Sequence, residues 1–154
     1  MKHFGYTALF LFVNFLGLYV GSLLMDQGPS SFWYLGLNQA PWTPPGWVFG
    51  IAWSSIMICF SIYLTYLLQD FNSIIFWIIY IIQCILNISW NYVFFNLHST
   101  VYGLIIIVLL TIVIVFYFFN FKSPQLMFKK YLLFPYILWL FIASSLNLYI
   151  VIYN

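Results

Sequence analysis

The stretch Trp33–Trp53 reads WYLGLNQAPWTPPGWVFGIAW and joins an aromatic loop to the start of a long apolar segment. Within it, Thr43–Pro45 predicts a helix start, because a proline at the first helical positions loses no backbone hydrogen bond and Thr43 can act as the cap residue. Trp47 then falls in the first turns of that helix, and Trp53 lies about two turns deep. A loop so rich in rigid aromatic side chains indicates a cover over a flat, apolar ligand.

The composition excludes a soluble domain. Of the 154 residues, 66% are hydrophobic, 25% are aromatic and 4% are charged, whereas a soluble domain carries about 25% charged residues. The formal net charge of +2 comes from too few lysines to follow a phosphate backbone, so we expect no nucleic-acid partner. Cys59 and Cys84 lie in apolar runs and form no metal-ligand pattern, so we expect no metal site and no required cofactor.

Five apolar segments are each long enough to cross a bilayer as a helix. They lack the polar–apolar alternation of barrel strands, and the first is too long for a signal peptide. They run over residues 4–25, 45–68, 73–95, 101–121 and 131–152. The chain is therefore predicted to be an all-α integral membrane protein, a single domain over residues 1–154 that forms a five-transmembrane-helix bundle.

All four lysines fall on one side of this predicted bundle. Lys2 precedes the first span, while Lys122, Lys129 and Lys130 lie between the fourth and fifth spans. The positive-inside rule then places the N-terminus in the cytoplasm and the first loop outside. The predicted location is a bacterial inner membrane, with membrane lipid around the bundle.

Amide and aromatic residues recur at helical spacing on one face of the third and fifth spans. They are Asn87, Trp90, Asn91 and Phe94 in the third span and Trp139, Ala143 and Asn147 in the fifth. Either the amides join helices through hydrogen bonds or these faces line a cavity, and the residues leave both interpretations open. No Asp, Glu, Lys or Arg lies deep in a span, which argues against a proton-coupled pump.

Gly17 and Gly21 form a GxxxG spacing in the first span. Such a spacing allows two helix backbones to approach closely and often mediates dimers. We therefore predict that, where two copies of the chain pair, these two glycines lie at the interface.

Three ordered motifs lie in Trp33–Trp53, in Asn87–Phe95 and in Pro135–Asn147. Together they resemble the signatures of the translocator protein family, also called TspO/MBR or tryptophan-rich sensory proteins, and the likeness covers essentially the whole chain. The resemblance implies a five-helix bundle, a homodimer, and a pocket between the helices under the first loop.

Members of that family bind porphyrins such as protoporphyrin IX, and isoquinoline- or benzodiazepine-type compounds, so the resemblance implies such a ligand here. The pocket residues that it implies are Trp33, Pro44, Trp47, Phe49, Trp53, Asn87, Trp90, Phe94, Trp139, Ala143 and Asn147. Gln39 departs from the family, which often has a basic residue there. Tyr153 is followed by no cation, so we do not expect a sterol ligand.

Two functions remain after this comparison. The first is a membrane receptor or carrier for porphyrins, used in sensing or transport. The alternative is an enzyme that degrades bound porphyrin in light and oxygen, with Trp53 and Trp139 as the candidate catalytic residues. The first is preferred, because the sequence shows no conventional acid–base or metal-dependent catalytic motif.

Overall fold

The computed structural model describes residues 2–154, without the side chain of Lys2, and Met1 lies outside the described residues. Within residues 2–154, five helices are long and apolar enough to cross a membrane, which confirms the predicted all-α membrane fold. These helices are α1 (Lys2–Leu24), α3 (Gly46–Asp70), α4 (Ile74–Asn91), α5 (Thr100–Asn120) and α7 (Phe134–Tyr153).

Short helical pieces occupy the ends of the long helices. In the first loop these are η1 (Gly28–Ser30) and α2 (Phe32–Leu35), and a π-helical turn, η2 (Tyr92–Asn96), continues α4. Ahead of α7 stand α6 (Leu126–Lys129) and a 3₁₀ turn, η3 (Lys130–Leu133). Helical structure on the fifth span therefore begins five residues before the predicted start at residue 131.

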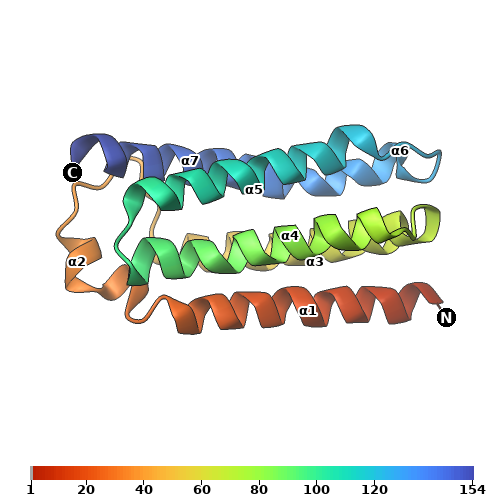
Figure 1. Cartoon of the computed structure of the whole chain (residues 1–154), viewed down its shortest axis with the longest axis horizontal. Helices are drawn as coiled ribbons and strands as arrows, with labels where there is room; N and C mark the ends of the chain where they lie inside the picture. Colours follow the sequence, from red (N-terminus) through yellow and green to blue (C-terminus); the bar gives the residue numbers. More distant parts are fainter. Residues whose placement is uncertain (1) are drawn as a thin grey trace.

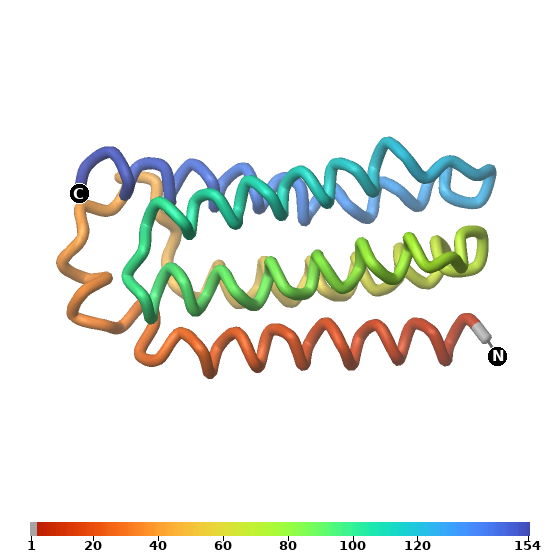
Figure 2. The backbone as a smooth tube through the Cα atoms, in the orientation of Figure 1, coloured from red at the N-terminus to blue at the C-terminus, as the bar shows by residue number. Residues whose placement is uncertain are grey.

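The five long helices close into a ring in which each packs on two neighbours. α1 packs on α3 and α4, α4 on α5, α5 on α7, and α7 on α3. The N-terminus and α6 lie at one end of the bundle, while the first loop with α2 and the C-terminus lie at the other (Figure 1). The tube in Figure 2 follows the same path and shows the first loop crossing the end of the bundle from α1 toward the end of α7.

The predicted cap at Thr43 is wrong. α3 begins at Gly46 after Pro45, which makes no side-chain capping bond. The Thr43 N–H instead donates to the carbonyl of Ala40 at 2.9 Å and closes a turn in the loop. Pro45 is extended, with ψ of 148°, so it separates Thr43 from the free N–H groups of the helix. Trp47 does lie in the first turn, as predicted.

Buried polar side chains join helices through the centre of the bundle. The Asn14 amide donates to Ser61 Oγ at 2.9 Å, and the Tyr80 hydroxyl donates to Asn14 Oδ1 at 3.0 Å, so α1, α3 and α4 are linked. Gln83 Nε2 donates to the Tyr136 hydroxyl at 3.0 Å and links α4 to α7. Because hydrocarbon offers no alternative partner, these bonds set how each helix is rotated about its axis.

Gly17 and Gly21 both face α4 of the same chain. A Cβ added at Gly17 would meet Ile88 at 3.7 Å, and one added at Gly21 would meet the Asn91 amide at 2.7 Å. The GxxxG spacing therefore lets α1 approach α4 within one bundle, and a dimer through these glycines stays a prediction.

We predict that Gly21→Leu destabilises the protein, because the added side chain would enter the space that Asn91 occupies. Overpacking of this kind costs about 1–3 kcal/mol. Thermal unfolding of the detergent-solubilised protein, followed by circular dichroism, measures the effect. The control is Gly5→Leu on the same helix, where an added Cβ meets nothing within 4 Å. Equal melting temperatures for the two variants would contradict the assigned α1–α4 contact.

Candidate ligand site

One face of α7 organises the predicted site. Trp139, Ala143 and Asn147 recur at four-residue spacing, and Trp139 and Asn147 are 6% and 2% exposed. Ala143 is half-buried between them. Two groups of aromatic side chains meet this face, one from the α4–α5 region and one from α3.

The first group centres on a hydrogen-bonded tryptophan. The Trp90 and Phe94 rings stack with centroids 5.3 Å apart and planes 10° apart. With the Asn147 amide oriented so that both its groups are paired, its oxygen accepts from Trp90 Nε1 at 3.3 Å and its nitrogen donates to the Thr100 carbonyl at 3.0 Å. Three of the predicted residues thus lie together and satisfy one another's polar groups.

The π-helical turn η2 was not anticipated, and it shapes this group. Phe94 and Phe95 are both buried, at 2% and 7% exposed. Consecutive residues of a regular α-helix point about 100° apart, whereas the wider π turn carries one extra residue and allows both rings to face inward. Such turns are frequent at functional sites. The paired phenylalanines belong to the motif over Asn87–Phe95, but nothing in their spacing predicts a π turn.

Gly103 on α5 also shapes this group, and the sequence analysis does not predict it. An added Cβ there would lie 3.0 Å from Phe94 Cδ2 and 3.3 Å from the Asn147 amide. A side chain at this position would press on both neighbours, so glycine favours the close approach of α5 to Phe94 and Asn147. The available signal was a single glycine inside an otherwise apolar run of the fourth span.

The first loop covers this group with its own aromatic rings. Trp33 stacks on His98, with centroids 4.3 Å apart and planes 15° apart, and presents its edge to Phe94 at 5.5 Å. Tyr34 lies 5.3 Å from Phe95, and burial raises the pKa of this tyrosine, so its hydroxyl stays protonated. Trp33 therefore lies over Phe94.

Hydrogen bonds fasten the loop to the end of α7. The Asn38 backbone N–H donates to Asn154 Oδ1 at 2.9 Å, and the Asn38 side chain donates to the Tyr153 carbonyl at 3.0 Å. Further along, Trp42 Nε1 donates to Ser145 Oγ at 3.2 Å, and its ring meets Tyr149 edge-on at 5.4 Å. The loop is thus tied to α7 at two separate points.

The second group lies along the seam between α3 and α7. Phe49 meets Trp139 edge-on at 5.1 Å, and Trp53 meets Tyr136 edge-on at 5.9 Å. In α3, which the structure describes in full, burial begins only at Ile56. The first turns of α3 are therefore less enclosed than the rest of the helix, and their half-buried aromatic rings form one wall of the seam.

Three predicted residues stand outside these two groups. Trp47 is 68% exposed at the start of α3, and Pro44 is half-buried in the loop just before it. Asn87 turns toward α1, where it lines a hollow of about 180 Å³ with Asn14 and Gly17. The helical face predicted for the third span is therefore divided, with its amides toward α1 and its aromatic rings toward α5 and α7.

Comparison with known proteins identifies the architecture. Residues 8–153 match the TspO/MBR family. The chain belongs to this family. Its membership confirms the resemblance drawn from the three motifs, and with five candidate spans it makes the chain an integral membrane protein of the tryptophan-rich sensory class.

Relatives of this TspO/MBR protein come from organisms as different as Archaeoglobus fulgidus and Homo sapiens. It is 30% identical to the tryptophan-rich protein TspO of Archaeoglobus fulgidus over 141 residues, 88% of each chain. It is 33% identical to the protein of the same name from Chlorobaculum tepidum over 125 residues, 77% of each chain. It is 28% identical to the human translocator protein over 138 residues, 86% of this chain and 80% of that one.

We predict that Gly103→Val loosens the first aromatic group, because its side chain would displace Phe94 or Asn147. The expected loss is about 1–3 kcal/mol of stability, measured by thermal unfolding in detergent. Gly50→Val is the matched control, since it is also a helical glycine and an added Cβ there meets nothing within 4 Å. If the two variants melted together, the close approach of α5 to Phe94 and Asn147 would be refuted.

Proposed function

We propose that this protein is a membrane receptor or carrier that binds a porphyrin such as protoporphyrin IX between α3 and α7, beneath the first loop. The observation that carries the proposal is the aromatic seam. Phe49 and Trp53 on one helix face Trp139 and Tyr136 on the other, at the level where α3 is least enclosed. Flat isoquinoline- or benzodiazepine-type compounds suit the same walls.

The edge-on contacts across the seam favour a flat ligand on physical grounds. A macrocycle entering between α3 and α7 would exchange edge-to-face contacts for offset stacking, which adds about 0.5–1.5 kcal/mol per ring pair beyond the area buried. The loop supplies amides rather than cations: Gln39 Nε2 donates to the Tyr34 carbonyl at 3.0 Å. We therefore expect porphyrin binding to come from apolar contact and to change little with salt.

The lack of charged residues deep in the spans favours some uses of the bound porphyrin over others. No Asp, Glu, Lys or Arg lies deep within a span of the sequence, and proton- or ion-coupled transporters generally place such a group there. Sensing or facilitated transfer is therefore preferred over active pumping. A second copy of the chain, as a homodimer, and membrane lipid are the other partners that we propose.

The second candidate is light- and oxygen-dependent degradation of the bound porphyrin. In this reaction, the excited porphyrin would take an electron from Trp53 or Trp139, and O2 would add to the reduced macrocycle. Return of the electron to the tryptophan radical would then leave both oxygen atoms on the porphyrin, whose ring opens. What favours it is that Trp53 meets Tyr136 edge-on at 5.9 Å, because a tyrosine can exchange an electron with an oxidised tryptophan. The candidate requires porphyrin to lie in the same seam.

We predict saturable quenching of tryptophan fluorescence when protoporphyrin IX is added to the purified protein in detergent, in the dark. Replacing Phe49 with Ala, which removes one wall of the seam, should weaken binding about 3- to 10-fold, as expected for loss of one ring contact. Phe128→Ala is the control, because Phe128 is 73% exposed at the opposite end of the bundle. Absence of saturation in the native protein would overturn the proposal.

The same complex under illumination separates the two candidates. For the double variant Trp53→Phe, Trp139→Phe we predict binding within about threefold of the native protein, because phenylalanine preserves ring contact. If the protein is a receptor or carrier, the porphyrin Soret band should stay constant in native protein and variant alike. Loss of the band with native protein but not with the variant would establish the enzyme. Trp77→Phe serves as the control, because Trp77 lies near the start of α4, at the end of the bundle opposite the first loop.

We also propose that the lysine-bearing end faces the cytoplasm. With Cys59 and Cys84 replaced by Ala, a membrane-impermeant maleimide added to intact bacterial cells should label Ser30→Cys in the first loop but not Pro124→Cys in the α5–α6 loop. Both positions are exposed. Labelling of Pro124→Cys alone would reverse the orientation.

A further inference from the structure

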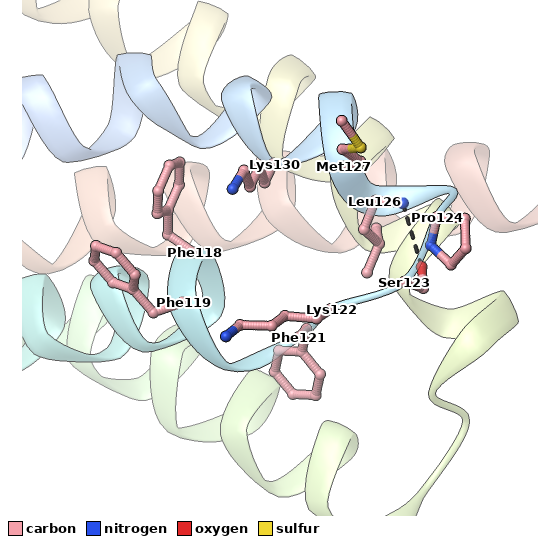
Figure 3. Close-up of a pocket in the computed structure, with 9 residues that line it drawn as sticks. All are labelled: Phe118, Phe119, Phe121, Lys122, Ser123, Pro124, Leu126, Met127 and Lys130. Atoms are coloured by element: carbon pink, nitrogen blue, oxygen red, sulfur yellow. Dashed lines mark hydrogen bonds between the residues drawn. The ribbon is translucent and has the colours of Figure 1, made fainter.

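A second hollow lies at the end of the bundle opposite the aromatic loop. It encloses about 390 Å³ between the end of α5, the connecting loop and the α6–η3 segment. Its walls combine cationic and apolar side chains, and the residues that matter here are Phe118, Phe119, Phe121, Lys122, Met127 and Lys130. Figure 3 shows these side chains gathered around the bend between the two helices.

The two lysines of this hollow extend in the same direction. In Figure 3 both ammonium groups point back along the hollow toward Phe118 and Phe119, one from each side of the bend. Lys130 Nζ lies 5.0 Å from the centre of the Phe118 ring and 5.6 Å from that of Tyr131. These aromatic rings hold the Lys130 stem in place while its charge remains free to attract an anion.

Hydrogen bonds hold the connecting loop against the end of α3. Ser123 Oγ donates to Asp70 Oδ2 at 2.5 Å and accepts from the Leu126 N–H at 3.2 Å. Gln125 Nε2 donates to Gln69 Oε1 at 3.5 Å. This loop leads from Lys122 to α6, so its attachment to α3 sets the distance between the sides of the hollow that carry Lys122 and Lys130.

We propose that this hollow binds the headgroup of an anionic phospholipid, with its phosphate between Lys122 and Lys130. The apolar rim suits the first part of the acyl chains, because Phe119 and Met127 are 62% and 60% exposed beside the lysines. Paired cations next to apolar surface, at the end of a transmembrane bundle, match a lipid phosphate joined to hydrocarbon better than they match a soluble anion. The inner-leaflet source of the lipid rests on the orientation proposed above.

The test is lipid retention by the purified full-length protein, measured by native mass spectrometry in mixed micelles of phosphatidylglycerol and phosphatidylcholine. We expect phosphatidylglycerol to be retained preferentially. The double variant Lys122→Gln, Lys130→Gln should weaken that retention about 30-fold, from the energy of two lysines beside an anionic headgroup. The matched control is Lys129→Gln: Lys129 lies over Tyr66, 4.9 Å from the ring centre, and does not line the hollow.

Equal retention of the two lipids, no loss in the double variant, or the same loss in Lys129→Gln would each overturn the proposal. Competition with inorganic phosphate separates a lipid site from a simple anion site. A lipid site should retain phosphatidylglycerol when inorganic phosphate is present at the same concentration as the lipid. Displacement of the lipid under that condition would overturn the proposal. A salt titration of the native protein gives an independent reading, since retention that is insensitive to salt would also refute the role of the lysines. None of these measurements depends on the orientation of the protein or on porphyrin binding.

Discussion

Each buried amide or hydroxyl in the spans must find a partner inside the bundle, because hydrocarbon supplies none. This constraint determines how the helices are ordered and rotated. Asn14 joins α1 to α3 and α4, Gln83 joins α4 to α7, and Asn147 joins α7 to α4 and α5. Apolar packing by itself would tolerate many rotations of each helix, since lipid and neighbouring helices are equally apolar. The hydrogen bonds between buried polar side chains select one rotation for each helix.

The two ends of the bundle differ because α3 is enclosed along only part of its length. From Ile56 onward it lies in the core, where the Tyr63 hydroxyl also donates to the Tyr117 carbonyl at 2.9 Å. Its first turns meet α7 through the half-buried rings of Phe49 and Trp53. A flat ligand bound at the loop end, as proposed, would therefore leave the polar core intact, while the lysine end offers charge beside apolar surface. The two proposed sites use different chemistry at opposite ends of one bundle.

Local sequence signals predicted where the helices lie better than they predicted which residues contact one another. The five spans and Trp47 in the first turn of α3 follow from local pattern. Thr43 was wrongly expected to cap α3, since the two prolines ahead of the helix separate Thr43 from its first turn. The π turn at Tyr92–Asn96 left no signal, because its extra residue is selected by the fit of Phe94 and Phe95 against neighbouring helices.

The sequence by itself determined the membrane setting, the helical class and the family. A chain with 4% charged residues cannot form a soluble surface, and a bilayer accepts backbone in long apolar segments only as helices. Only the tertiary structure decided which surfaces meet. The spacing of Gly17 and Gly21 is the same whether the opposing helix belongs to this chain or to another, and the structure places α4 of the same chain there. Likewise Asn87 and Trp90 share a helix face, yet they part toward α1 and α7, because the width of that face spans two neighbouring helices.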